Sequence, residues 1–300
     1  MMKISMSIGA LVRKYGPDKG FAMMKGAGFD GVDFGFNMFY SYGDIVNGKT
    51  ESIFGKSMGE VREFMRPYMD ALKTNKLEML QAHTPFPLYT KHDSSNEAVI
   101  EAAKKCIILC GEAGCPYLVV HPRFGDYDWR LDADTQWEVN REMYLKLLPY
   151  ARDCKVGICL ENMYTVNRGR VIGSACSDVY ETVSYIDRLN DIAGEEIFSF
   201  CYDSGHQMLI GQDQRANLRT LGKRVRALHL HDNDARDDLH MPAYTGRCDW
   251  DAVLEGLKDI GFDQTLNFET GPAAFPEEVW PQVLSLIVAT GRYFASRLEK

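Results

Sequence analysis

The sequence has 300 residues, of which 45% are hydrophobic and 25% are charged, and this composition excludes disordered and fibrous chains. Its 42 acidic residues outnumber its 34 basic residues, and the resulting charge of -8 provides no overall attraction to nucleic acid or to an anionic membrane. No apolar run approaches the roughly 20 residues that a membrane helix needs, so we expect no membrane partner.

The amino-terminal segment predicts a buried strand rather than a secretory signal. Ser5 and Ser7 interrupt its apolar stretch, and Arg13 and Lys14 stand where a cleavage site with small residues would be needed. The eight cysteines form no CxxC pair, and most of them lie in apolar stretches. Such a distribution favours buried, reduced thiols, so we expect a cytoplasmic protein.

Short apolar runs alternate with longer segments of helical periodicity along the whole chain. The runs that predict strands are 3–8, 31–34, 78–82, 117–120, 156–160, 197–202, 227–230 and 265–268. Helices are predicted between them, among others at 96–113, 135–152, 178–189, 250–260 and 277–298. Capping-box patterns mark two of the helix starts, Ser94 with Glu97 and Thr135 with Glu138.

Eight strands that alternate with eight helices predict an α/β fold, a single (β/α)8 TIM barrel with parallel strands that occupies residues 1–300 as one domain. The rival is a doubly wound open sheet. It usually has fewer strands, and no GxGxxG motif follows the first predicted strand here. We therefore expect the barrel.

The one long polar interruption, residues 36–56, is expected to be a loop on the active-site face of the barrel. Its aromatic residues Phe36, Phe39, Tyr40 and Tyr42 fit a lid over a substrate. They fit equally well a small hydrophobic cluster beneath a long loop.

Six consecutive predicted strands, the third to the eighth, end in a histidine or an acidic residue. These residues are His83, His121, Glu161, Asp203, His229 and Glu269. A single histidine at a strand end is more often structural, but the succession is unusual. TIM barrels place catalytic groups at the carboxyl ends of their strands, so we expect these side chains to converge. Carboxylates together with neutral imidazoles suit a divalent cation such as zinc or manganese.

Further histidines fall on the same predicted rim. His206 lies three residues after Asp203, and His240 lies in the loop after the seventh strand. His231 shares a strand face with His229 because side chains alternate with a period of two. Six of the seven histidines are thus expected on this rim, and only His92 is expected elsewhere.

These motifs resemble those of the xylose-isomerase-like TIM barrels, the superfamily that unites sugar-phosphate isomerases and epimerases with endonuclease IV. The resemblance runs from the first predicted strand to the last helix. Its marks are HTPFP at 83–87, VVHP at 119–122, LENM at 160–163, YDSGH at 202–206, HLHDND at 229–234, DLH at 238–240 and NFET at 267–270.

In the epimerase branch, the resemblance implies one divalent ion (Mn, Zn, Mg or Co) held by Glu161, Asp203, a histidine of the seventh strand and Glu269. His229 matches the ligand position of the family, and His231 is the alternative. The resemblance also implies that Glu161 and Glu269 are the catalytic pair, which moves a proton next to a carbonyl through an enediolate. The expected partner is a small sugar or sugar phosphate, and homo-oligomerisation is left open.

Several rim residues are candidates for substrate binding. The resemblance implies that His206 contacts a substrate oxygen, and its neighbours on the rim extend the expected set to His83, His121, His231 and Arg236. Arg123 and Arg236 lie in predicted rim loops, where an arginine can meet a phosphate or an acid group. Trp129 and Trp250 are candidates for stacking on a sugar ring, although Trp250 also fits the outer packing of the barrel.

Two other functions remain as alternatives. Endonuclease IV resembles this chain at nine metal-binding positions, which would give three zinc ions and cleavage of abasic DNA; they are His83, His121, Glu161, Asp203, His206, His229, Asp238, His240 and Glu269. The same positions recur among sugar-directed relatives, and residues 36–56 contain only Lys49 and Lys56 as basic residues, so nucleic acid is not the expected partner. A non-catalytic sugar-binding barrel is less consistent with the full set of carboxylates and imidazoles.

Overall fold

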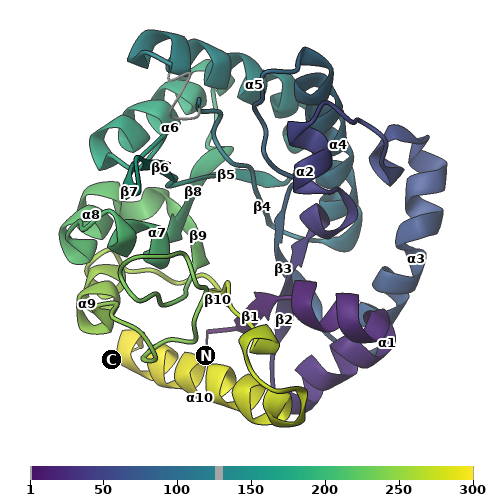
Figure 1. Cartoon of the computed structure of the whole chain (residues 1–300), viewed down its shortest axis with the longest axis vertical. Coiled ribbons are helices and arrows are strands. Elements are labelled where there is room, and N and C mark those ends of the chain that lie inside the picture. The colour runs from purple at the N-terminus through teal and green to yellow at the C-terminus, as the bar shows by residue number, and fades with distance from the viewer. Residues whose placement is uncertain (1, 126–130, 300) are drawn as a thin grey trace.

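The computed structural model describes residues 2–125 and 131–299, and it shows a parallel eight-stranded barrel inside a ring of helices (Figure 1). The prediction of a (β/α)8 barrel is confirmed, and each predicted strand overlaps an observed one. The barrel strands are β1 (Ile4–Ser7), β2 (Gly31–Gly35), β3 (Glu78–His83), β4 (Tyr117–Val119), β5 (Gly157–Glu161), β8 (Phe198–Asp203), β9 (Val225–His229) and β10 (Leu266–Phe268).

The sheet closes on itself, which excludes the doubly wound alternative. The hydrogen-bonded order is β10-β1-β2-β3-β4-β5-β8-β9, with all of these pairs parallel. A parallel bridge between Leu230 and Phe268 joins the two outer members of this order. Here the backbone N–H of Leu230 donates to the carbonyl oxygen of Asn267 at 3.0 Å, and that of Glu269 donates to Leu230 at 3.2 Å. All eight carboxyl ends therefore open onto the same face.

Amphipathic helices cover the outside of the barrel. The long ones are α1 (Gly9–Ala27), α3 (Met58–Thr74), α4 (Asp93–Ala113), α5 (Ala133–Cys154), α6 (Val179–Ala193), α8 (Gln214–Leu221), α9 (Trp250–Asp259) and α10 (Trp280–Leu298). Each buries one apolar face; α10, for example, buries Val283, Ile287 and Phe294. In the described ranges, no helix combines the length and the apolarity that crossing a membrane requires.

The two predicted capping boxes are wrong. Helix α4 already contains Ser94, and its N-cap residue His92 makes no side-chain capping bond. Helix α5 begins two residues before Thr135, because the carboxylate of Asp132 accepts the backbone N–H of Thr135 at 2.9 Å and its hydroxyl at 2.7 Å. An ionised aspartate is a stronger acceptor for the first free N–H groups of a helix than a threonine hydroxyl, so Asp132 takes the N-cap position.

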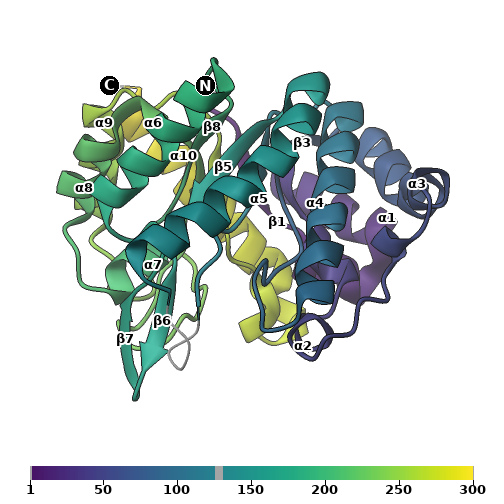
Figure 2. The same cartoon turned by 90° about the horizontal axis from the view of Figure 1, so that it is seen from above.

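An antiparallel hairpin that the sequence analysis did not predict follows β5. Its strands are β6 (Tyr164–Asn167) and β7 (Arg170–Gly173), which pair with each other as a separate sheet. Figure 2 shows the hairpin extending beyond the ring of helices. Its turn residues Arg168 and Gly169 both have positive φ, at 48° and 77°, which is the geometry of a two-residue hairpin turn. The sequence signal for this hairpin was Gly169 at the second position of the turn, between two short strands that each contain β-branched residues.

Candidate functional site

Four of the predicted ligands meet at the carboxyl ends of the barrel strands. Glu161, Asp203 and His229 are the last residues of β5, β8 and β9, and Glu269 directly follows β10. One ligand atom of each lies within 4.8 Å of the others. The Nδ1 atom of His229 is 3.0 Å from Glu161 Oε1, 3.2 Å from Glu269 Oε2 and 3.8 Å from Asp203 Oδ2. We call these four residues the carboxylate centre.

The carboxylate centre fits a divalent cation. Glu161 and Asp203 are at most 1% exposed, and in the described part of the chain only histidines lie within ion-pairing distance of the three carboxylates. Buried carboxylates in such proximity need positive charge. Moreover, Glu161 Oε2 is buried without a hydrogen bond of good geometry. Three carboxylates and one imidazole suit Mn²⁺, Zn²⁺, Mg²⁺ or Co²⁺.

The same carboxylates perturb His229. Burial by itself lowers the pKa of this imidazole, but the neighbouring Cys201, Glu161 and Glu269 together raise it well above its ordinary value. Burial likewise raises the pKa of Glu161, whereas His229 and His121 hold it well below its ordinary value. The carboxylate of Glu161 and the imidazole of His229 thus stabilise each other's charged forms.

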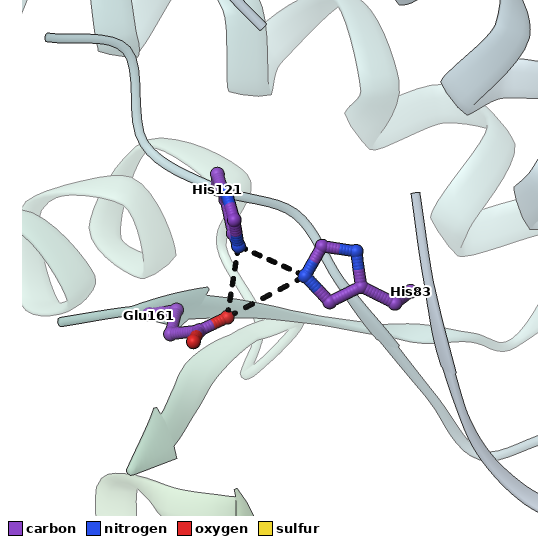
Figure 3. Close-up of side chains that lie close together, drawn as sticks. All are labelled: His83, His121 and Glu161. Atoms are coloured by element: carbon purple, nitrogen blue, oxygen red, sulfur yellow. Dashed lines mark hydrogen bonds and ion pairs between the residues drawn. The ribbon is translucent and has the colours of Figure 1, made fainter. Parts of the chain in front are cut away.

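A second group of side chains shares Glu161. His83 Nε2 and His121 Nε2 are 2.9 Å apart, and they lie 3.5 Å and 3.1 Å from Glu161 Oε2. Figure 3 shows both rings directed at this carboxylate oxygen. His83 Nδ1 donates to the carbonyl oxygen of Thr84 at 2.7 Å, which leaves the lone pair on Nε2 in the neutral ring. Burial lowers the pKa of His121 to about 4, so this ring is neutral at physiological pH.

A third group lies beside Asp203. Asp238 Oδ2 is 3.3 Å from His206 Nε2 and 3.1 Å from His240 Nε2. His231 Nε2 lies 3.0 Å from Asp203, and the His231 ring stacks on His240 with a centroid separation of 4.2 Å. His231 thus contacts Asp203 from outside the carboxylate centre, whereas His229 lies within it. This geometry favours His229 over His231 as the ligand from β9 and the residues after it.

Most members of these three groups form one end of a cavity of about 540 Å³, a volume suited to a small molecule. Asp203, His229 and His231 are fully buried and do not line it. Its far walls come mainly from the loop after β3 and from the start of the hairpin. His92 also lines the cavity, so its predicted place away from the rim is wrong. The lining residues beyond the three groups include Tyr42, Val46, Phe86, Pro87, Leu88, Tyr89, Thr90, Lys91, His92, Pro122, Phe124, Met163, Tyr164 and Thr165.

The two arginines proposed for anion binding do not line this cavity. Arg236 is exposed beside a separate hollow, because its backbone N–H and that of Asp237 bond to the side chain of Asp234 and turn the loop outwards. Arg123 is buried, and its guanidinium donates to the carbonyl oxygens of Leu88 at 2.9 Å and Asn96 at 3.4 Å. It therefore holds the loop after β3 in place.

The aromatic residues of 36–56 divide between the two interpretations. Phe36 packs against Phe34 and Phe54, and Tyr40 is also buried, as a hydrophobic cluster requires. Phe39 likewise packs into this cluster of rings. Tyr42, which is 58% exposed, lines the cavity as a lid residue would.

Trp250 provides no stacking surface in the cavity. Trp250 is buried in the outer packing, and its Nε1–H donates to Asp232 at 2.9 Å. Trp129 lies outside the described residues. Tyr164 was not predicted as a site residue with a definite role; its hydroxyl lies 3.3 Å from Asp238 Oδ2 and its ring packs edge-on against His206. Its position directly after the LENM motif was the only signal.

Comparison of the sequence with those of other proteins identifies relatives of this chain. The uncharacterized protein y4fM of Sinorhizobium fredii (strain NBRC 101917 / NGR234) is 27% identical over 179 residues. The match spans 60% of this chain and 55% of that protein, so it covers about half the length of this relative.

Solved structures with the same fold include sugar epimerases. A D-tagatose 3-epimerase-like protein has a TM-score of 0.72 and 18% identity, with 99% of this chain and 98% of that chain covered. D-allulose 3-epimerase from Methylomonas sp. in complex with D-allulose has a TM-score of 0.70 and 14% identity, with 99% and 96% covered. The IOLI protein with a bound zinc atom has a TM-score of 0.69 and 15% identity, with 99% and 98% covered.

Sequence identities this low show only that these structures share the fold with this chain. A match to a family model, in contrast, shows membership of the family. Residues 21–289 match the model of the family described as xylose isomerase-like TIM barrel. This match covers most of the chain and includes every residue of the three groups at the carboxyl ends of the strands. The chain therefore belongs to the xylose isomerase-like TIM barrel family.

Proposed function

We propose that this protein is a divalent-metal-dependent isomerase or epimerase of a sugar or sugar phosphate, and that it moves a proton at a carbon next to a carbonyl group. The observation that carries the proposal is the convergence of Glu161, Asp203, His229 and Glu269 next to a cavity that the two glutamates line. Sugar epimerases among the structures with this fold, one with D-allulose bound, support the same class of substrate.

The carboxylate centre would hold the metal ion, with Glu161, Asp203, His229 and Glu269 as ligands. When bound, a divalent ion acts as a Lewis acid that stabilises negative charge as it develops on the substrate oxygens. The bound zinc of the IOLI structure, which shares this fold, is consistent with such a site.

Glu161 and Glu269 are the proposed proton carriers. They extend from β5 and β10, two strands that are not neighbours in the barrel, so they reach the cavity from different sides. One carboxylate removes the proton from the carbon next to the carbonyl, and the other returns a proton to the resulting enediolate. A well-placed general base of this kind typically contributes about 10²–10⁴-fold to the rate.

The surrounding histidines can orient the sugar. His83, His206 and His240 each direct Nδ1 to a backbone carbonyl oxygen, at 2.7, 2.8 and 2.8 Å, so each Nδ1 must donate. In a neutral His83, Nε2 then carries a lone pair that accepts a hydrogen bond from a hydroxyl group. The Nε2 atoms of His206 and His240 face the carboxylate of Asp238, and against the effect of burial the acidic groups around them raise the pKa of both imidazoles to about 10, so these two rings present a proton rather than a lone pair. All three residues line the cavity, which suits a substrate with several hydroxyl groups.

The test replaces each glutamate separately by glutamine, which keeps the shape of the side chain but does not accept a proton at neutral pH. Metal content and incorporation of solvent deuterium into a ketose are measured on the same preparation. When each variant is loaded with saturating metal, Glu161→Gln and Glu269→Gln should each lower exchange by at least about 100-fold. Glu101→Gln, on the exposed face of α4, is the matched control and should exchange normally. A metal-loaded variant that exchanged at the wild-type rate would exclude that glutamate as a proton carrier.

One observation favours a second candidate function, phosphodiester cleavage of the endonuclease IV type. The nine residues expected for three zinc ions all lie in the three groups described above. Against it, Lys49 of the loop 36–56 already pairs with Asp44 at 3.2 Å, which leaves little positive charge there for DNA. Metal counted per chain separates the two, with one ion expected for the sugar enzyme. Efficient cleavage of abasic duplex DNA at low salt would reverse the ranking.

A further inference from the structure

A layer of buried polar side chains lies beneath the carboxylate centre, and the proposed function does not use it. Strands β1, β2, β3 and β10 contribute Ser5, Asp33, Gln81 and Asn267, each at most 2% exposed. Asp33 is the one acidic residue among these four. A carboxylate at such depth is costly unless it has suitable partners, so its contacts indicate what it does.

Neutral donors and one imidazole surround Asp33. Its Oδ2 atom accepts from Asn267 Nδ2 at 2.9 Å and from Gln81 Nε2 at 3.3 Å. His229 Nε2 lies 3.4 Å from the same oxygen, and this is the one ion pair that Asp33 makes within the described ranges. The Oδ1 atom of Asp33 and the Nε2 atom of His229 are both buried without a hydrogen bond of good geometry. The two groups thus face each other, and the thiol of Cys201 is a further close neighbour of the imidazole.

His229 is oriented differently from its neighbours. His83, His206 and His240 direct Nδ1 to a backbone carbonyl and Nε2 to the site. His229 directs Nδ1 to the carboxylate centre and Nε2 to the carboxylate of Asp33. A neutral imidazole has one protonated and one unprotonated nitrogen, and a carboxylate beside one nitrogen retains the proton there.

We infer that Asp33 is a positioning residue, whose carboxylate holds the proton of His229 on Nε2 and thereby reserves Nδ1 for the metal ion. The inference rests on the proposed metal site and adds a residue from β2, a strand that supplies none of the proposed ligands. A carboxylate behind a metal-binding histidine fixes the ring and makes it a better donor, and losing such a partner typically weakens metal binding about 10–100-fold.

The experiment compares zinc binding of the wild type, Asp33→Asn and Ser5→Ala by competition with a chromophoric chelator. Asp33→Asn keeps the shape of the side chain but removes its charge, and it should raise the dissociation constant for zinc about 10–100-fold. Ser5→Ala is the matched control. It removes the 2.6 Å hydrogen bond to Asn267 in the same buried layer without touching His229, so the zinc affinity should stay within about threefold.

A second measurement requires no variant of Asp33. In the zinc-loaded, ¹⁵N-histidine-labelled wild type, NMR should show His229 with a protonated Nε2 and a metal-bound Nδ1, and the signal is assigned by its loss in His229→Gln. A wild-type His229 that binds zinc through Nε2 would overturn the role of Asp33, as would Asp33→Asn with unchanged zinc affinity. A wild type that binds no zinc, manganese or cobalt would instead overturn the proposed function.

Discussion

Asp232 is buried completely, and it anchors the loop that carries Asp238 and His240. Its Oδ1 atom accepts the backbone N–H groups of Asn233 at 2.9 Å and Cys248 at 2.8 Å, while Oδ2 accepts Trp250 Nε1–H at 2.9 Å. Asp232→Asn can preserve at most two of these three bonds, because the new amide N–H₂ group must face at least one donor.

The cost follows from the bonds involved. A hydrogen bond to a charged acceptor contributes about 1.5–3 kcal/mol, and the two remaining bonds would lose their charged acceptor. We therefore expect Asp232→Asn to lower the free energy of unfolding by about 2–4 kcal/mol. Trp250→Phe removes the donor opposite Oδ2, so the combined variant Asp232→Asn/Trp250→Phe relieves the clash between the two donors. The double variant should therefore lose less free energy of unfolding than the two single variants lose together, by about 1 kcal/mol or more.

The assay is urea unfolding followed by far-ultraviolet circular dichroism on the wild type, both single variants and the double variant. This signal does not depend on the tryptophan that is replaced. An Asp232→Asn protein within about 0.5 kcal/mol of the wild type would refute the reasoning, because that range is ordinary for surface substitutions. Strict additivity in the double variant would show that Asp232 and Trp250 are not coupled.

Three further outcomes are expected. A divalent ion at a free concentration of 100 times its dissociation constant should raise the free energy of unfolding of the wild type by about 2.7 kcal/mol. In a thermal-shift assay, Asp203→Asn should lose most of this metal-dependent stabilisation. Gly205→Ala should abolish the soluble fold or displace the His231 ring, since a Cβ atom would lie 2.0 Å from it, whereas Gly26→Ala in open space should raise stability by about 0.5–1 kcal/mol in urea. Arg123→Met removes the side-chain donor to the buried carbonyl oxygen of Leu88, so it should lower the free energy of unfolding by about 1–3 kcal/mol in urea and raise KM in steady-state assays.

The positions of the strands and of the carboxylate centre could be predicted from the sequence because both depend on short-range pattern. A buried parallel strand appears as a short apolar run, and a polar residue at its end marks the face on which the strand opens. For Glu161, Asp203 and His229, the last residue of the strand and the site residue are the same. The barrel then fixes their proximity without any further information from the sequence.

The remainder depends on contacts between residues that are far apart in the sequence. Arg123 and Arg236 look alike as loop arginines, but the carbonyl oxygens of Leu88 and Asn96 bury the first, and the side chain of Asp234 turns the second loop outwards. The two capping boxes failed for a local reason, since a better-placed aspartate or an earlier helix start replaced each of them. In the sequence, Asp33 is a single acidic residue within the apolar run 31–34, and nothing in that run indicates its contact with His229.

The hairpin β6–β7 has a consequence for how the binding specificity of this cavity can change. Its strands pair only with each other in the described structure, so insertions or substitutions near its tip leave the hydrogen bonds of the barrel intact. Tyr164 and Thr165 at its base nevertheless line the cavity. The hairpin is therefore a module whose length can be altered, or exchanged with that of a relative, to change which small molecule the cavity accepts, while the carboxylate centre stays on a separate and unaltered framework.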